Sequence, residues 1–384
     1  MQTVYDILKN KGRKARIAVM RYRFIGDTLL TVPFLKALRS ALPEAEIDVF
    51  VAPNSGEVLA HCPYFNRLIF WDTSRKHRYE NPLLQSGAIE TRRPQNFWQS
   101  AQILRAGRYD AVFVLKRSFS SALLAFLAGI PLRVGFNTEA RGLFLTHRIA
   151  YEMDRHEIDC YLDHLRLTGF PESCFEESCQ QGEPALEMFF EAGELEQARE
   201  TILPYQGKLN ILLHLTSSNT AKQWPDEAAK TLLSWLLEQP DVHVHFMGAQ
   251  SDASLYERLK SELAAQYAGD AALFFEKRLH NWCGQFSIRQ SAAVLKHLQL
   301  AIGVDSGTMH LARAVEVPSI VLFGPMSEIK WRPPGANVLT HPVDCHPCHL
   351  KTPCHREFSC IRDLSADAVI EEAKRQLALI KLKL

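Results

Sequence analysis

Short apolar runs alternate with longer segments of helical periodicity along most of this chain. The first run is 16–20 (RIAVM), and apolar residues at helical spacing follow it over 28–42. Similar short runs come next, at 47–51, 67–71, 111–115 and 133–135. Strands that alternate with helices predict a parallel sheet with helices on both of its faces.

The alternation stops in a polar segment and then begins again. Residues 172–207 are rich in Cys, Gln, Glu, Pro and Gly, with a helix predicted near 186–203. Strand-like runs return after it, at 210–214, 242–247, 298–302 and 319–323, and an amphipathic helix is predicted for 364–384. We therefore expect two similar α/β domains, 1–180 and 208–384, joined by a connection at 181–207.

Length and charge agree with this division. A chain of 384 residues exceeds the size at which one hydrophobic core stops growing, so two domains are expected. Lys and Arg total 44 against 43 Asp and Glu, which argues against a nucleic-acid binder that works through a broad basic surface. One basic segment, 9–16 (KNKGRKAR), can contact an anionic bilayer at about 1 kcal/mol per basic residue near the surface. A solvated lead-in to the first strand is the simpler interpretation.

The chain shows no sign of export or membrane insertion. No run approaches the roughly 18 apolar residues of a membrane span, and residues 1–14 lack the apolar core and cleavage site of a signal peptide. We therefore expect a cytoplasmic protein. Its 9 cysteines are too sparse for a disulfide scaffold, so a reducing compartment keeps them as thiols unless a metal binds them.

The loops that follow the strands carry the candidate chemistry, because ligands of open α/β sheets bind beyond the carboxyl ends of the strands. The first such loop is 21–28, in which Gly26 permits a tight turn and Asp27 lies where a helix should begin. Asp27 has two interpretations. It caps the helix by accepting hydrogen bonds from the first free amides, or it presents a carboxylate that accepts a proton from a substrate hydroxyl.

The second loop, 214–225, directly follows the first strand of the second domain. It presents the hydroxyls of Thr216 and Ser217 and the ammonium group of Lys222. This composition suits phosphate oxygens, with the lysine as a point charge. An ordinary Ser/Thr-rich turn into the helix after Pro225 is the alternative.

The third loop, 303–310, is a turn of small residues that leads into a helix. The free amides and dipole of a helix N-terminus favour an anion, and Ser306 and Gly307 lie at that turn. Asp305 can bond backbone amides or reach a sugar hydroxyl. His310 either faces the phosphates or is a buried core histidine.

These three loops, in this order, resemble those of glycosyltransferase family 9, the ADP-heptose:lipopolysaccharide heptosyltransferases. The matching pieces are RFIGDTLLTVPFLKAL, the segment that reaches KQWP at 222–225, and GVDSGTMHLARAVEVPSIVLFGP. The resemblance covers both halves and implies the GT-B fold, two Rossmann-like domains with the active site between them. It also implies a cytoplasmic enzyme that transfers heptose from ADP-heptose to a lipid-linked surface glycan with inversion and without a required metal.

The resemblance assigns roles to individual residues. Asp27 matches the acidic residue taken as the general base on the acceptor side, and Lys222 matches the lysine near the donor phosphates. Thr216 and Ser217 match the hydroxyl pair of the same loop, with one more residue before the lysine than in some members. The residues that match the donor-binding turn are Asp305, Ser306, Gly307 and His310.

A cysteine cluster stands apart from these loops. Cys345, Cys348, Cys354 and Cys360 have the spacing C-x2-C-x5-C-x5-C. Four thiolates so close in sequence can close a tetrahedral structural zinc site, and iron is an alternative. Reduced cysteines in a surface loop are the simpler interpretation.

Three other functions stay open from the sequence. The chain can be a transferase of this family that uses another nucleotide sugar or a protein acceptor. It can also be a two-domain protein that binds a nucleotide sugar without catalysing a reaction. Asp27 argues against the pure binder. A zinc-ribbon nucleic-acid binder is the most remote reading, since no basic, aromatic-bearing surface is evident.

Overall fold

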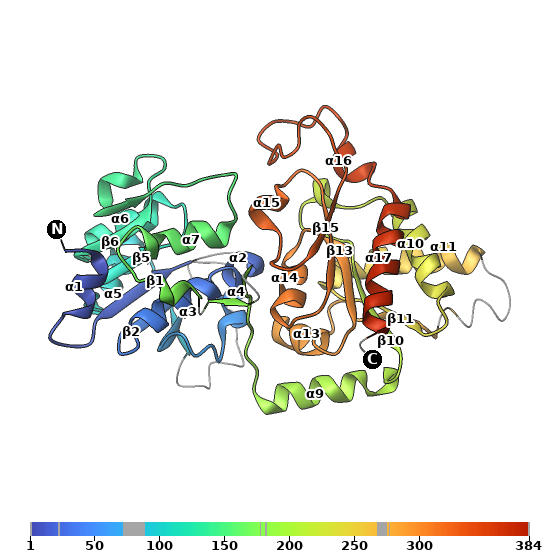
Figure 1. Ribbon diagram of the computed structural model, residues 1–384, viewed down its shortest axis with the longest axis horizontal. Coiled ribbons are helices and arrows are strands. Elements are labelled where there is room, and N and C mark those ends of the chain that lie inside the picture. The colour runs from blue at the N-terminus through green and yellow to red at the C-terminus, as the bar shows by residue number, and fades with distance from the viewer. Residues whose placement is uncertain are drawn as a thin grey trace. The chain divides into compact units, whose positions relative to one another are not determined.

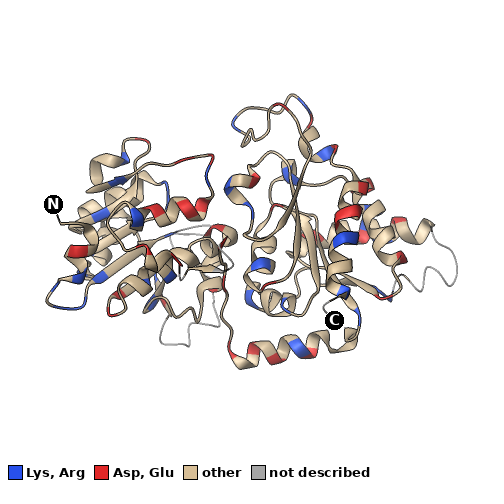
Figure 2. Cartoon of the chain, in the orientation of Figure 1, with Lys and Arg blue, Asp and Glu red and all other residues tan. Residues whose placement is uncertain are grey.

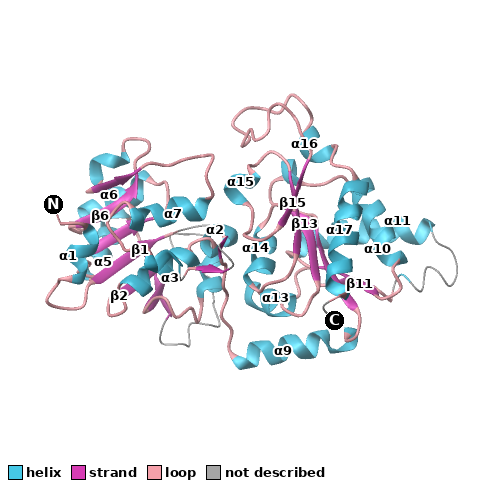
Figure 3. Ribbon diagram, viewed as in Figure 1, coloured by secondary structure: helices cyan, strands magenta, loops and turns pink. Residues whose placement is uncertain are grey.

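The computed structural model describes residues 2–21, 24–71, 89–176, 178–180, 183–266, 275 and 277–382. The chain divides into two compact units, Met1–Phe189 and Phe190–Leu384. Each unit is built on a parallel sheet covered by helices, as Figures 1 and 3 show. The α/β class predicted from the alternating pattern is therefore confirmed.

The first unit contains a seven-stranded sheet in the order β4-β3-β2-β1-β5-β6-β7, with every neighbouring pair parallel. The pairing places β1 in the centre, where Ile17 lies opposite Ile47 on one side and Ala111 on the other. The strands are β1 (Arg16–Met20), β2 (Glu46–Val51), β3 (Arg67–Trp71), β4 (Ile89–Arg92), β5 (Ala111–Val114), β6 (Leu132–Phe136) and β7 (His147–Ile149).

Helices cover both faces of this sheet, which explains why its central strands are apolar throughout. One face packs Met20 and Phe50 against Leu104 of α5 and Leu124 of α6. On the other, the ring of Phe34 meets Phe113 edge-on at 5.4 Å. The principal helices are α1 (Val4–Lys9), α2 (Ile25–Leu29), α3 (Val32–Ala41), α5 (Phe97–Ala106), α6 (Phe119–Leu127) and α7 (Glu157–Arg166).

The single helix predicted for 28–42 is wrong, because two helices occupy this stretch. The first, α2, ends at Leu29, and α3 begins at Val32 with Pro33 in its first turn. Proline has no amide hydrogen to donate back to Leu29, so the helical hydrogen-bond ladder is interrupted there. The Thr31 hydroxyl donates to the Thr28 carbonyl at 2.6 Å and closes the break.

The second unit contains a six-stranded sheet in the order β12-β11-β10-β13-β14-β15, again with parallel pairs. Counted from β10, this is the order 3-2-1-4-5-6 of the Rossmann fold, with its switch point between β10 and β13. The strands are β10 (Leu209–His214), β11 (Val242–Phe246), β12 (Leu279–Asn281), β13 (Leu300–Val304), β14 (Ser319–Phe323) and β15 (Asn337–Thr340).

Helices also enclose the second sheet. Leu233 of α10 and Val369 of α17 belong to one core with Ile211 of β10. The terminal helix predicted for 364–384 is α17, which spans Ala366–Lys381. No helix in the described part of the chain combines the length and the apolar character that crossing a membrane requires. The helices are α9 (Ala192–Ile202), α10 (Asp226–Glu238), α11 (Ala253–Gln266), α13 (Ile288–Leu295), α14 (Gly307–Ala314), α15 (Glu328–Trp331), α16 (Ser359–Arg362) and α17 (Ala366–Lys381).

The division between the units falls within 181–207, the segment predicted as the connection. Most of that segment belongs to the second unit, because its helix α9 packs there. The Arg289 guanidinium on α13 is 2.6 Å from the Glu194 carboxylate on α9, and the arginine side chain is buried. The remainder of α9 carries charges of both signs (Figure 2).

Candidate active site

In the first unit, Asp27 lies in the loop and short helix that follow the central strand β1. It is the third residue of α2, whose capping residue is Phe24 at φ 60°, a strained conformation for a large side chain. The N-cap position is held by Phe24, whose side chain makes no capping hydrogen bond, so Asp27 is not the N-cap residue. The interpretation of Asp27 as a plain helix cap is therefore wrong.

Asp27 instead forms an ion pair with Arg21, the residue directly after β1. An Arg21 guanidinium nitrogen lies 2.6 Å from Asp27 Oδ2, and the two side chains are only 8% and 14% exposed. The Arg21 Nε also donates to the hydroxyl of Tyr161 on α7 at 3.0 Å. Arginine thus joins the strand end, the short helix and α7 at one point.

Charges around Arg21 keep it protonated in spite of its burial. Burial acts to lower the pKa of the guanidinium, but its neighbours raise it overall, chiefly Tyr161 and Asp27. Glu157 of α7 adds to the same effect and accepts a hydrogen bond from Tyr151 at 2.8 Å. Because Arg21 stays charged, its ion pair with Asp27 holds the carboxylate in place after the end of β1.

In the second unit, Lys222 and Asp305 come together at the switch point of the sheet. Lys222 ends the short helical turn after β10, and Asp305 directly follows β13. The Lys222 Nζ lies 2.6 Å from Asp305 Oδ2, with side chains 20% and 9% exposed. Asp305 therefore orients the lysine, a role that the sequence did not indicate.

Gly303, next to the last residue of β13, allows β13 to approach the end of β10 closely. A Cβ atom at Gly303 would lie 2.4 Å from the carbonyl oxygen of His214, so only glycine fits there. Ser306 precedes α14, and its buried hydroxyl has no hydrogen-bond partner within the described residues. Gly307 begins α14, and His310 lies buried one turn further along.

The loop after β10 is ordered by its own side chains. The Ser217 hydroxyl accepts from the amide of Asn219 at 3.3 Å, and the Gln223 amide donates to the Ser217 carbonyl at 3.3 Å. Thr216 and Ser217 are both partly exposed. Trp224 anchors the end of the loop, since its buried indole donates to the Leu364 carbonyl at 2.9 Å.

The four clustered cysteines lie on one loop that ends in α16. Cys345 is exposed, Cys348 and Cys354 are partly buried, and Cys360 is buried. Burial raises the pKa of the Cys360 thiol to about 11, and the other three thiols add to the rise. In the described part of the chain, no three His, Cys, Asp or Glu side chains stand in an arrangement that would hold a metal ion.

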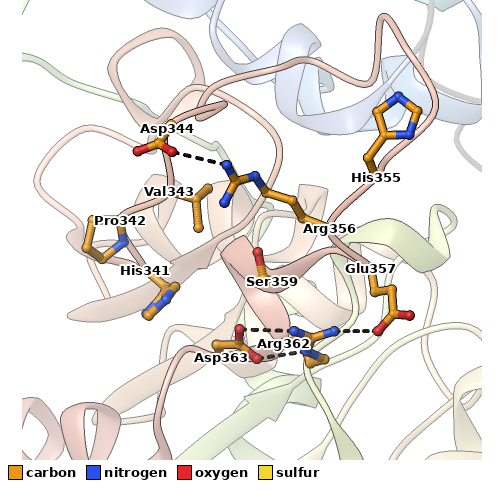
Figure 4. Close-up of a pocket in the computed structure, with 10 residues that line it drawn as sticks. All are labelled: His341, Pro342, Val343, Asp344, His355, Arg356, Glu357, Ser359, Arg362 and Asp363. Atoms are coloured by element: carbon orange, nitrogen blue, oxygen red, sulfur yellow. Dashed lines mark hydrogen bonds and ion pairs between the residues drawn. The ribbon is translucent and has the colours of Figure 1, made fainter.

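This cysteine loop packs against the loop that follows β14. The two ring nitrogens of His346 contact the Gly324 carbonyl and the Glu328 carboxylate, each at 2.8 Å. The His349 amide donates to the Pro325 carbonyl at 2.9 Å. Beside it the loop lines an open pocket of about 550 Å³, in which Asp344 pairs with Arg356 at 3.0 Å (Figure 4).

Comparison with known proteins finds that this chain is similar to heptosyltransferases. The model of glycosyltransferase family 9 (heptosyltransferase) matches residues 97–355. Lipopolysaccharide heptosyltransferase 2 of Escherichia coli K12 is 25% identical over 321 residues, which is 81% of this chain and 83% of that protein.

Two solved structures show the same fold. E. coli ADP-heptose lps heptosyltransferase II superimposes with a TM-score of 0.69 at 20% identity, over 95% of this chain and 99% of that one. The dodecameric iron-containing heptosyltransferase TibC in complex with ADP-D-beta-D-heptose gives 0.53 at 11% identity, over 96% of this chain and 77% of that one. The predicted fold class, two Rossmann-like units of the GT-B type, is confirmed.

The Arg21–Asp27 pair generates a stability prediction. Replacing Arg21 with Met removes the buried cation from a carboxylate that is only 14% exposed, so the free energy of unfolding should fall by about 3–5 kcal/mol. Lys14→Met is the control, because Lys14 pairs with Glu44 at 3.3 Å through side chains 63% and 81% exposed. That change should cost roughly 0–1 kcal/mol. Equal losses in urea denaturation of the two variants would contradict the account of the buried pair.

Proposed function

Because this chain belongs to glycosyltransferase family 9, we propose that it transfers a heptosyl group from ADP-heptose to a hydroxyl of lipopolysaccharide. Its glycosyltransferase class follows from the family, and the sugar, nucleotide and acceptor follow the names of the relatives. The observation that carries the proposal is the partly buried carboxylate of Asp27, fixed by Arg21 at the carboxyl end of the central strand.

On the acceptor side, Asp27 acts as the general base of a single displacement. The acceptor hydroxyl loses its proton to the Asp27 carboxylate while its oxygen forms a bond to the anomeric carbon. The bond between that carbon and the diphosphate oxygen breaks, and ADP leaves with the electron pair. One displacement inverts the anomeric configuration.

On the donor side, fixed protein groups stabilise the charge that grows on the diphosphate. Lys222 supplies the cation and is held by Asp305 at 2.6 Å. The hydroxyls of Thr216 and Ser217 supply hydrogen bonds, and the amides at the start of α14 face the same strand edge. Ser306 and Gly307 form that turn, while His310 supports it from the helix. This set takes the place of a divalent metal in the transfer step.

The proposed acceptor also defines where the protein works. A lipopolysaccharide precursor is lipid-linked, so the enzyme meets it at the cytoplasmic face of the inner membrane. The protein is therefore a peripheral cytoplasmic enzyme in this proposal. A thermal-shift screen of nucleotide sugars distinguishes ADP-heptose from other donors, since a ligand at about a hundred times its Kd stabilises a fold by roughly 2.7 kcal/mol.

The role of Asp27 is tested by Asp27→Asn. The amide keeps the shape but cannot accept the proton, so turnover with ADP-heptose and a lipopolysaccharide acceptor should fall about 10²- to 10⁴-fold. The affinity for ADP should not change, because the proposed donor groups belong to the second unit. Some loss of stability is expected, since Arg21 loses its ion pair.

The matched control is Asp110→Asn. Asp110 is buried and, like Asp27, ion-paired, with Lys11 at 2.5 Å and Arg13 at 2.7 Å, but it precedes β5 at the opposite edge of the sheet. Both variants are assayed below their melting temperatures, and Asp110→Asn should retain turnover. Near-normal turnover of Asp27→Asn would refute the general-base role.

We also propose that Cys345, Cys348, Cys354 and Cys360 bind one structural zinc ion, with iron as the alternative. Their spacing supports this, and so does the name of an iron-containing relative with the same fold. The described arrangement of the four thiols does not itself form such a site. The metal would fix the loop that packs on Gly324 and Pro325, and no step of the transfer passes through it.

The metal proposal predicts about one zinc or iron ion per chain in untagged protein. The double change Cys348→Ser and Cys354→Ser should abolish the metal content and lower the melting temperature. Cys179→Ser, outside the cluster, should alter neither. Elemental analysis that finds no metal in the unmodified chain would reject the site.

A further inference from the structure

The first unit exposes a group of large apolar side chains on one side. Phe119 and Phe126 stand seven residues apart on α6, and they are 45% and 47% exposed. The ring of Phe144, in the turn after β6, contacts both at 5.2 and 5.6 Å, and its neighbour Leu143 is 73% exposed. We call Phe119, Phe126, Leu143 and Phe144 the aromatic face.

One arginine contacts the aromatic face, and further basic residues lie close to it in sequence. The Arg133 guanidinium lies 5.4 Å from the ring centre of Phe126 and donates to the Phe144 carbonyl. Arg117 precedes Phe119 by two residues and is exposed, as is Arg148. Residues 116–149 contain five basic side chains and one acid, Glu139, which pairs with Arg141.

We propose that the aromatic face docks on an anionic lipid bilayer. Apolar rings enter the interface between headgroups and acyl chains, and basic side chains beside them attract acidic lipids at about 1 kcal/mol each. A folded protein rarely leaves such rings exposed together without a binding role. This inference rests on the proposed function, because a lipid-linked acceptor requires the enzyme to reach a membrane.

The position of the face suits that acceptor. Strand β5 is the parallel neighbour of β1, with Val114 opposite Met20. The loop after β5 carries Arg117 and leads to Phe119, so it leaves the same edge of the sheet as the loop that carries Asp27. A bilayer at the aromatic face would therefore lie on the unit that holds the proposed base.

The basic segment at 9–16 is less suited to this role than its sequence indicates. Lys11 and Arg13 both pair with Asp110, at 2.5 and 2.7 Å. Lys14 pairs with Glu44 at 3.3 Å, and Arg16 pairs with Glu46 at 3.2 Å. Much of its charge is paired within the unit, whereas residues 116–149, which include the aromatic face, contain four basic side chains besides the buried Arg141 that pairs with Glu139.

A second copy of the chain fits the face less well. Self-association about a two-fold axis would bring the basic residues of both copies together. Four apolar side chains also fall short of the roughly 20–30 residues that each partner gives to a stable interface.

Vesicle flotation of the full chain tests the proposal without donor or acceptor. The protein should float with vesicles of phosphatidylethanolamine and phosphatidylglycerol, less so at high salt, and hardly with phosphatidylcholine alone. Leu143→Glu should weaken binding by about tenfold or more, and Phe119→Ser with Phe126→Ser should do the same. Leu203→Glu, at a residue of the second unit that is 57% exposed, should float normally.

The same variants separate this proposal from the proposed function. Leu143→Glu should keep full turnover on a delipidated, water-soluble acceptor and lose turnover on an acceptor presented in vesicles. Flotation of Leu143→Glu equal to that of the unmodified chain would overturn the membrane role. So would a concentration-dependent dimer that Leu143→Glu dissociates, or failure of the unmodified chain to float. A chain that floats through this face but transfers no heptose would refute the proposed function alone.

Discussion

Parallel strand pairing is the constraint on which the candidate sites of both units depend. In a parallel sheet every strand ends at the same edge, so residues distant in sequence meet there. In the first unit this brings the loop after β1 beside the loop after β5. In the second unit it joins Lys222, after β10, to Asp305, after β13, although 83 residues separate them. The strand order alone therefore determines which loops lie side by side at each site, whatever side chains those loops carry.

Buried charge is the second constraint, and the chain satisfies it by pairing. An ion removed from water costs several kcal/mol unless a partner offsets the loss. Arg21 and Asp27 meet this demand for each other, with Tyr161 as a further contact. The consequence for function is direct, since the ion pair fixes the position of the carboxylate that the proposal makes the general base.

The sequence predicted the central strands well, because burial on both faces requires continuous apolar runs such as 16–20 and 319–323. It did not predict the strands β4, β7, β12 and β15, which are short and largely half-exposed at or near the edges of the sheets. Their residues lack the apolar run that marks a buried strand. The missing amide hydrogen of Pro33 also indicates the break between α2 and α3, although the apolar spacing over 28–42 predicted a single helix.

The same limit applies to the candidate sites. Motifs identified Asp27, Lys222 and the turn at 305–307, because each lies in the segment that directly follows a strand. They could not identify Tyr161 as a hydrogen-bond partner of Arg21, because Tyr161 lies 140 residues further along the chain. The spacing of the four cysteines suggested a metal, but spacing does not fix the arrangement of the thiols. Short-range patterns predict which side chains reach an edge, and long-range pairing decides which of them touch.

Product stereochemistry tests the central claim most directly. The unmodified protein is incubated with ADP-heptose and a lipopolysaccharide acceptor in buffer that contains EDTA, and the anomeric configuration of the product is determined by NMR. A single displacement assisted by Asp27 predicts one added heptose with the configuration opposite to that of the donor. A product that retains the donor configuration, or hydrolysis of ADP-heptose without transfer to the acceptor, would contradict the account.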